Sequence, residues 1–86
     1  MIEDLETRRR RIKFRAWHRG MREMDLLLGP FVDAELASFD AQDVADFEAL
    51  LDVPDQTAFQ WMLGTSAPDP AHDTPVWRRL TAFHKR

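Results

Sequence analysis

The residues with the most obvious capacity for chemistry in this 86-residue chain are three histidines, and their spacing does not favour a metal site. His18, His72 and His84 fall in three separate segments, without the short spacing that brings two imidazoles onto one metal ion. Cysteine is absent, so disulfides, thiolate ligands and thiol nucleophiles are excluded. The three glycines are scattered rather than gathered in a phosphate-binding loop. We therefore expect no metal, no stably bound cofactor and no enzymatic activity.

A second group of polar side chains surrounds Gly20 in the stretch WHRGMREMD, residues 17–25. Because strong helix formers precede and follow this glycine, we expect Gly20 to adopt a left-handed conformation between two antiparallel helices. Two interpretations of Arg19 and Glu23 stay open. In the first, Arg19 is a cation at a helix C-terminus and Glu23 reaches back to free backbone N–H groups. In the second, the pair is presented to another polypeptide.

Charge is segregated along the chain. Residues 1–25 carry eight basic and five acidic groups, residues 26–75 carry ten acidic groups and no Lys or Arg, and residues 76–86 carry four basic groups, for a net charge of -3. This pattern is typical of ends that pair with the middle of one fold, or of a surface that meets an oppositely charged partner. For the run RRRR at residues 8–11 we rank internal pairing first, an acidic protein second and nucleic acid third. Fifty consecutive residues without a cation make a poor nucleic-acid surface.

The elements that position these residues are predicted to be five short helices and no strand, giving an all-α bundle of antiparallel helices. Pro30 should kink or divide the second helix after Gly29. Asp55 or Thr57 is the expected cap of the fourth helix, and Thr74 caps the fifth, with Pro75 at its first position. The predicted helices cover about Leu5–Arg19, Met21–Ala37, the residues from Ser38 or Asp40 to Asp52, the residues from Asp55 to Leu63, and the segment after Thr74.

Helical spacing also predicts the core. Phe14 and Trp17 lie on a stripe beside the main apolar stripe of the first helix, and Trp77 lies off the inner stripe of the last. The fourth helix is apolar nearly all round, which is typical of a buried element. The expected inward residues are Leu5, Ile12, Ala16, Met24, Leu27, Leu28, Phe31, Val44, Phe47, Leu50, Leu51, Phe59, Trp61, Met62, Leu63, Val76, Leu80 and Phe83.

Length and composition bound the remaining possibilities. Eighty-six residues suffice for one domain, residues 1–86, and an apolar fraction of 44% supports a packed core. No apolar run follows the N-terminal positive charges, as a secretory signal requires, and no uncharged run approaches the length of a membrane span. We expect a cytoplasmic bacterial protein that is monomeric when free and does not insert into membranes.

The motif RGMRE at residues 19–23 resembles the RGxxE signature of the succinate dehydrogenase flavinylation (assembly) factors. The resemblance extends on both sides, from the basic and aromatic lead-in RIKFR at residues 11–15 to DLLL at 25–28, then to the Leu50-Leu51, Pro54-Asp55 and Trp61-Met62-Leu63 groups and to Pro68. It therefore covers about residues 8–70 in the right order. His18 stands where the family often has Arg or Lys, and Trp17 is bulkier than the usual residue.

This resemblance implies a five-helix bundle that helps the covalent attachment of FAD to a histidine of the flavoprotein subunit of succinate dehydrogenase, and of fumarate reductase in some cases. Arg19 would then reach across an interface to a carboxylate or to the flavin site, Gly20 would permit close approach, and Glu23 would orient Arg19 or pair with a partner cation. The alternative is an antitoxin-like or regulatory module that binds protein or nucleic acid. The expected partner-binding residues are Arg11, Arg15, Trp17, His18, Arg19, Gly20, Glu23 and Asp25.

Overall fold

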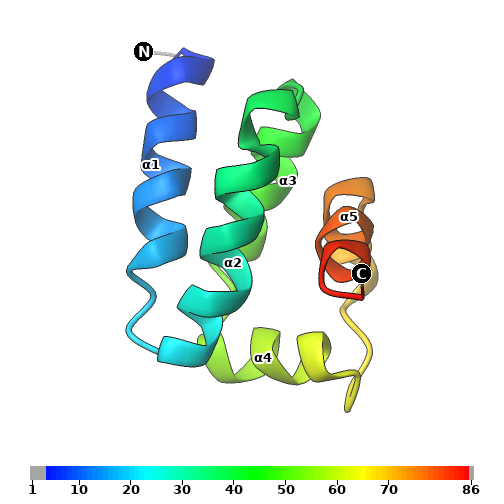
Figure 1. The fold of residues 1–86 in the computed structure, drawn as a ribbon. Helices are drawn as coiled ribbons and strands as arrows, with labels where there is room; N and C mark the ends of the chain where they lie inside the picture. Colours follow the sequence, from blue (N-terminus) through cyan, green and yellow to red (C-terminus); the bar gives the residue numbers. More distant parts are fainter. Residues whose placement is uncertain (1–3, 86) are drawn as a thin grey trace.

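All regular structure that the computed structural model describes, in residues 4–85, is helical, which confirms the predicted fold class. In chain order the elements are α1 (Leu5–Trp17), α2 (Arg22–Glu35), the 3-10 turn η1 (Leu36–Ser38), α3 (Ala41–Leu51), α4 (Asp55–Leu63), the 3-10 turn η2 (Pro70–His72) and α5 (Pro75–Phe83). Figure 1 shows α1 and α2 side by side as a hairpin, with α4 crossing at the end where the two helices join. Among residues 4–85, no helix has the length and apolar character that a membrane span requires.

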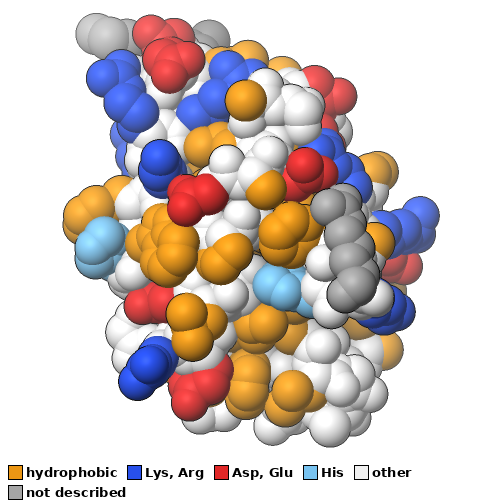
Figure 2. Space-filling model, viewed as in Figure 1, with side chains coloured by type: hydrophobic (Ala, Val, Ile, Leu, Met, Phe, Trp, Pro, Cys, Tyr) orange, Lys and Arg blue, Asp and Glu red, His pale blue; other side chains and the backbone are white. Residues whose placement is uncertain are grey.

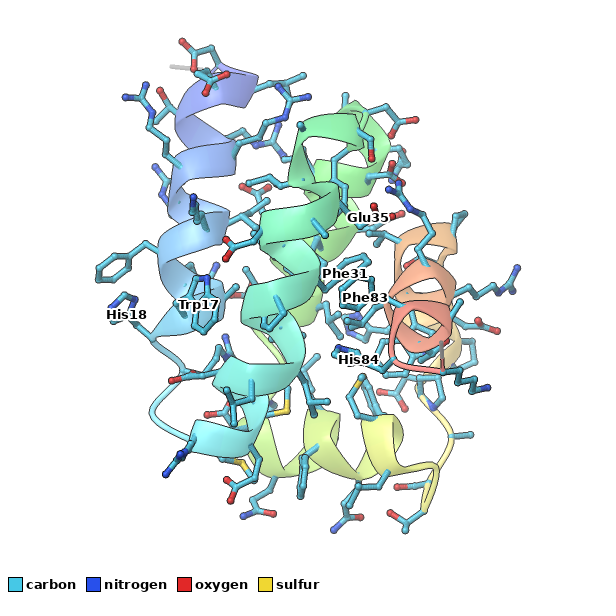
Figure 3. The ribbon with its side chains drawn as sticks, in the orientation of Figure 1. Trp17, His18, Phe31, Glu35, Phe83 and His84 are labelled. Atoms are coloured by element: carbon cyan, nitrogen blue, oxygen red, sulfur yellow. The ribbon has the colours of Figure 1, made fainter. Side chains whose placement is uncertain are left out.

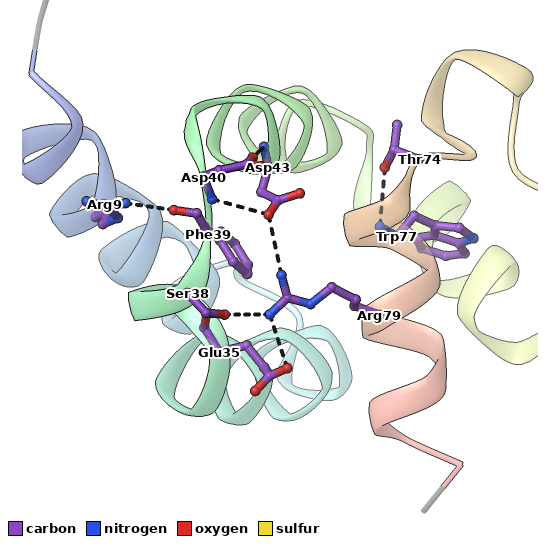
Figure 4. Close-up of polar contacts among 9 residues, drawn as sticks. All are labelled: Arg9, Glu35, Ser38, Phe39, Asp40, Asp43, Thr74, Trp77 and Arg79. Atoms are coloured by element: carbon purple, nitrogen blue, oxygen red, sulfur yellow. Dashed lines mark hydrogen bonds and ion pairs between the residues drawn. The ribbon is translucent and has the colours of Figure 1, made fainter.

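Two of the predicted helix starts are confirmed by their caps. The Asp40 carboxylate accepts a hydrogen bond from the Asp43 N–H at 2.8 Å, and the Asp43 side chain accepts one from the Asp40 N–H, so the two residues form a reciprocal capping box for α3. At α5 the Thr74 hydroxyl accepts from the Trp77 N–H at 3.2 Å, and Pro75 occupies the first turn (Figure 4). Each cap is worth about 1 kcal/mol of stability.

The core is centred on aromatic rings contributed by separate elements. The Phe31 ring lies 5.9 Å from Phe39, 6.0 Å from Phe47 and 5.5 Å from Phe83, measured between ring centroids (Figure 3). Aromatic pairs at this separation add stabilisation beyond their buried area. Seventeen buried apolar residues form one cluster: Ile12, Ala16, Met24, Leu28, Phe31, Val32, Phe39, Val44, Phe47, Leu50, Leu51, Val53, Ala58, Trp61, Val76, Trp77 and Leu80.

Of the two outcomes expected at Pro30, a kink or a division after Gly29, the division is wrong, because helix α2 continues through the proline. A proline removes the hydrogen bond to the carbonyl four residues earlier, here that of Leu26, at a cost of about 3 kcal/mol. Two features oppose that cost. The helix buries apolar side chains on both sides of the proline, and the His84 imidazole Nε2 lies 2.6 Å from the adjacent Leu27 carbonyl, where it acts as the donor. Packing on both sides of the proline therefore holds the helix intact, and His84, the residue after α5, adds a contact to the neighbouring Leu27 carbonyl.

Several other predictions need correction. Helix α1 ends at Trp17 rather than Arg19, and the α4 N-cap is Pro54, without a side-chain hydrogen bond, rather than Asp55 or Thr57. Leu63, expected to be buried, is 60% exposed because it lies at the end of α4, where little chain covers it. Phe14, for which the helical spacing predicted neither burial nor exposure, is 63% exposed because the α1 face that meets the core carries Ile12 and Ala16.

Candidate functional site

The connection between α1 and α2, residues 18–21, is the centre of the candidate site. His18 is the C-cap of α1, and Gly20 two residues later has φ +86°, which confirms its predicted left-handed conformation. A Cβ built at Gly20 would meet nothing within 4 Å. Glycine is therefore favoured there by the backbone angle and not by crowding.

Asp25 closes this turn from the first part of α2. Its Oδ1 accepts a hydrogen bond from the Arg19 backbone N–H at 2.8 Å. No side chain caps α2 directly, and Glu23 makes no hydrogen bond or ion pair with any of residues 4–85. The predicted hydrogen bond from free backbone N–H groups to Glu23 is therefore wrong. The Asp25 carboxylate accepts such a bond in the turn instead. Glu23 and its neighbour Arg22 are exposed.

The Arg19 side chain points into the molecule. Its Nε donates to Asp55 Oδ1 at 2.8 Å, Nη2 donates to the Val53 carbonyl at 3.0 Å, and Nη1 donates to the Leu51 carbonyl. Only 11% of the side chain is exposed. Charge-assisted bonds of this kind are strong where water is excluded. Arg19 therefore ties the α1–α2 turn to the connection between α3 and α4.

Arg15 reinforces the same tie. Its Nη2 donates to Asp52 Oδ1 at 2.8 Å and to the Leu51 carbonyl at 3.2 Å, so two guanidinium groups share one carbonyl oxygen. We call Arg15 and Arg19, with their acceptors on residues 51–55, the arginine clasp. The clasp fixes the position of the turn relative to the rest of the bundle.

Trp17 occupies the other side of the turn and packs on α2. A Cβ added at Gly29 would lie 2.4 Å from the indole ring atoms, so the ring rests directly on the helix backbone. The indole Nε1–H donates to Asp33 Oδ1 at 3.3 Å. Figure 3 labels Trp17, whose ring lies between α1 and α2. Gly29 is required for this contact because any side chain would displace the ring.

The sequence-predicted residues are only partly brought together. Arg19, Gly20, Glu23 and Asp25 share the turn, and Arg15 lies beside them in the clasp. Trp17 packs inward, and His18 is exposed at the end of α1. Arg11 lies two helical turns before Arg19 on an exposed part of α1.

Residues that were not predicted to belong to the site complete the arrangement. Asp52, Asp55 and the Val53 carbonyl are the acceptors of the clasp. The excess of acids in the middle of the chain indicated that such acceptors exist, but no local spacing indicated which arginine each would meet. Three separate side chains that can jointly hold a metal ion are not found within residues 4–85.

The segregated charges meet inside the fold. Arg8 Nη2 lies 2.6 Å from Glu48 Oε1, and Arg79 from α5 bonds Glu35 at 3.2 Å, Asp43 at 3.4 Å and the Ser38 hydroxyl at 2.6 Å (Figure 4). The first-ranked interpretation, ends paired with the acidic middle, is therefore confirmed for these cations. Arg10 and Lys13 remain on the exposed side of α1.

The fold and the turn define a small helical protein. Its two N-terminal helices are joined by a connection that Arg19 bonds to residues 51–55, with His18 and Gly20 exposed to solvent. A family model described as flavinator of succinate dehydrogenase matches residues 10–84. The chain belongs to this family, as the RGMRE motif predicts.

Relatives with assigned names agree with the family. The chain is 40% identical over 78 residues to the FAD assembly factor SdhE of Acetobacter pasteurianus, covering 91% of this chain and 72% of the relative. It is 38% identical over 80 residues to the mitochondrial succinate dehydrogenase assembly factors 2-A of Drosophila mojavensis and 2-B of Drosophila melanogaster. The chain spans about half the length of these insect relatives, 51% in each case. No solved structure matches the chain significantly.

Proposed function

We propose that this protein is an assembly factor that promotes covalent attachment of FAD to the flavoprotein subunit of succinate dehydrogenase. The observation that carries the proposal is the family match over residues 10–84, together with relatives named for FAD assembly and succinate dehydrogenase assembly. Fumarate reductase, whose flavoprotein would pose the same task, is included as a second client. The proposed location is the bacterial cytoplasm, and the proposed free form is a monomer.

The contribution of this chain is to bind and orient, without supplying the bond-forming groups. Holding two reacting groups in attack geometry lowers a barrier by removing the entropic cost of bringing them together. A rigid bundle that docks on the flavoprotein and fixes the relative position of its histidine and its FAD supplies this effect. The FAD belongs to the partner, and the assembly factor holds no cofactor of its own.

The α1–α2 turn is the proposed contact, and its residues divide into two roles. Glu23 and Arg22 are exposed and without partners within residues 4–85, so they are available to charges on the flavoprotein. Arg19 acts as a positioning residue, because its guanidinium binds the α3–α4 connection and fixes the direction in which the turn faces. Gly20 keeps the backbone of the turn open to close approach.

The test is a flavinylation assay with purified components. Apo-flavoprotein subunit is incubated with FAD, with or without this protein, and attached flavin is read by in-gel fluorescence after denaturation. The assembly factor should raise the yield several-fold. Glu23→Gln should lose most of that gain, because it removes a charge without disturbing the fold, whereas Asp69→Asn, at another exposed carboxylate, should keep it.

The result that rejects the proposal is an equal yield of attached flavin with and without the wild-type protein for both client flavoproteins. Salt-dependent binding of RNA or DNA by the same preparation, with no flavoprotein binding, would instead favour the regulatory alternative. The two results are distinguishable in one set of binding measurements.

A further inference from the structure

The most exposed large apolar side chain of residues 4–85 lies on the last part of α1, just before the RGMRE residues. Phe14 is 63% exposed, compared with 60% for Leu63 and 53% for Leu26. A single exposed apolar side chain is common in proteins. Phe14 differs because it is stacked on a second exposed ring and bordered by cations.

His18 forms that second ring. The Phe14 and His18 rings are 4.1 Å apart between centroids and inclined by only 15°. Residues four apart share one face of a helix, so the two rings stand one above the other at the end of α1. Figure 2 shows a histidine beside a hydrophobic side chain at the edge of the molecule formed by α1, where Figure 3 labels His18.

The stack is held in place before any partner arrives. The His18 Nδ1 lies 2.7 Å from the Phe14 carbonyl oxygen, which can only accept, so Nδ1 is the donor of this hydrogen bond. A ring pinned at one nitrogen and stacked on its face loses little further freedom on binding. Preorganised aromatic side chains give affinity for this reason.

Positive charge borders the stack. Arg10 is exposed one helical turn before Phe14, and Lys13 is 62% exposed in its side chain. Both line a groove of about 460 Å³ between α1 and α2, whose floor includes Val32 and Leu36. Two acids, Glu6 and Asp33, also line it, the latter 3.9 Å from Lys13 Nζ. With Arg9 as a third cation in the lining, the face combines an apolar anchor with a border of three cations and two acids.

We infer that the Phe14–His18 stack is a second anchor of the assembly factor, which inserts into an apolar pocket with carboxylates at its rim on the flavoprotein subunit. This inference rests on the proposed function and extends it from the α1–α2 turn to the outer face of α1. The partner is specified by complementarity, because a ring needs an apolar pocket and Arg10 and Lys13 need negative charge. Buried aromatic anchors of this type dominate binding energy, while charges at the rim govern association rate.

The experiment measures association and dissociation of the full chain with apo-flavoprotein at two salt concentrations. Phe14→Ala should weaken binding about thirtyfold, mainly through faster dissociation, as expected for loss of an aromatic anchor. Arg10→Ala should slow association at low salt and leave dissociation nearly unchanged. Leu63→Ala is the matched control, because it removes an equally exposed side chain from α4 and should bind like the wild type.

Flavin attachment supplies a second readout. With Phe14→Ala the yield should fall when assembly factor is scarce and recover at saturating concentration, since the anchor contributes affinity and no positioning of the reacting groups. Because Phe14 lies outside the core, its variant should keep the wild-type helical circular dichroism.

Three outcomes overturn the inference. Wild-type binding by Phe14→Ala, in a preparation where the wild type stimulates flavin attachment, rejects the anchor and leaves the proposed function intact. Failure of the wild type to bind or stimulate any client rejects the proposed function itself. A dimer of the wild type that Phe14→Ala dissociates, with unchanged flavoprotein affinity, assigns the stack to contact between two copies.

Discussion

Two helix ends in this molecule contain a left-handed glycine, and they are built in opposite ways. At the end of α4, Gly64 has φ +79° and is followed by local backbone bonds, from the Gly64 N–H to the Trp61 carbonyl at 3.2 Å and from the Thr65 N–H to the Gln60 carbonyl at 3.1 Å. After α1, Gly20 has φ +86°, but the neighbouring Arg19 is bonded through its backbone N–H to Asp25 and through its side chain to residues 51–55.

The difference teaches what a glycine at a helix end does and does not indicate. Both glycines have open space around the position of a Cβ, so their local requirement is the same. Of these two helix ends, the α1–α2 turn is the one that charged side chains bond to a distant part of the chain, through Arg15 and Arg19. A helix end that merely terminates needs local backbone bonds, whereas one that must face a fixed direction needs the additional long-range contacts.

Among the changes that test this difference, removing the arginine clasp should lower the free energy of unfolding the most. Arg19→Ala leaves Asp55 and the Val53 carbonyl without their donor, while the Leu51 carbonyl keeps only Arg15, and we expect a loss of about 3 kcal/mol in the free energy of unfolding. Arg19→Lys should recover little, because one ammonium cannot match the spread of three acceptors. Urea denaturation measures both. Arg78→Ala, at an arginine with 68% side-chain exposure, is the control and should change nothing measurable, and equal effects at the two positions would refute the role of the clasp.

At the third glycine, Gly29, a side chain is excluded by a neighbouring ring and not by the backbone angle. Gly29→Ala places a Cβ 2.4 Å from the Trp17 ring, and we expect a loss of about 2 kcal/mol in unfolding free energy because the ring must move. Trp17→Ala removes the obstacle, so the double variant should be more stable than the sum of the two single changes predicts. Strict additivity in the double-mutant cycle would show that the ring does not rest on α2.

The two left-handed glycines themselves should behave alike in stability and differently in function. Gly20→Ala and Gly64→Ala each force a Cβ into the left-handed region, at about 1 kcal/mol per residue in thermal or urea unfolding. Only Gly20→Ala should reduce flavin attachment, because only that turn faces the proposed partner. The comparison fails if Gly64→Ala reduces attachment as strongly as Gly20→Ala does at matched stability.

The smallest effect is expected at the opposite end of α1. Asp4 is its N-cap, and the hydrogen bond from the Thr7 N–H, 2.8 Å long, lowers the pKa of this exposed carboxyl. A carboxyl whose folded-state pKa is lowered adds stability above its unfolded pKa and loses it as the pH falls through its folded pKa. Asp4→Ala should therefore lower the melting temperature slightly at neutral pH and not at strongly acidic pH. An equal shift at both pH values would contradict the ionised cap.

Features with a local cause were predictable from the sequence. The caps Asp40 and Thr74, the proline at the first position of α5 and the left-handed conformation of Gly20 all follow from interactions within a few residues. The family followed from the RGMRE motif and its flanking segments.

Features with a distant cause were not predictable. Arg19 bonds acceptors 32 to 36 residues away, two of them main-chain oxygens that no residue type reveals. The helix α2 is not divided at Pro30, because apolar side chains on both sides of the proline are held in the core. Phe14 lies on a stripe that helical spacing alone could not assign to the core or to the surface.

The main-chain half of the clasp has a consequence for how this protein tolerates change. A carbonyl oxygen is present whichever amino acid occupies the position, so Val53 can be exchanged for another apolar residue without releasing Arg19. A substitution at Val53 is then tolerated if the backbone keeps its conformation. At Asp55, by contrast, Arg19 bonds the side chain itself, so the carboxylate is required. Saturation mutagenesis of residues 52–55 should accordingly show a Val53 position that accepts other apolar residues next to an Asp55 position that accepts few.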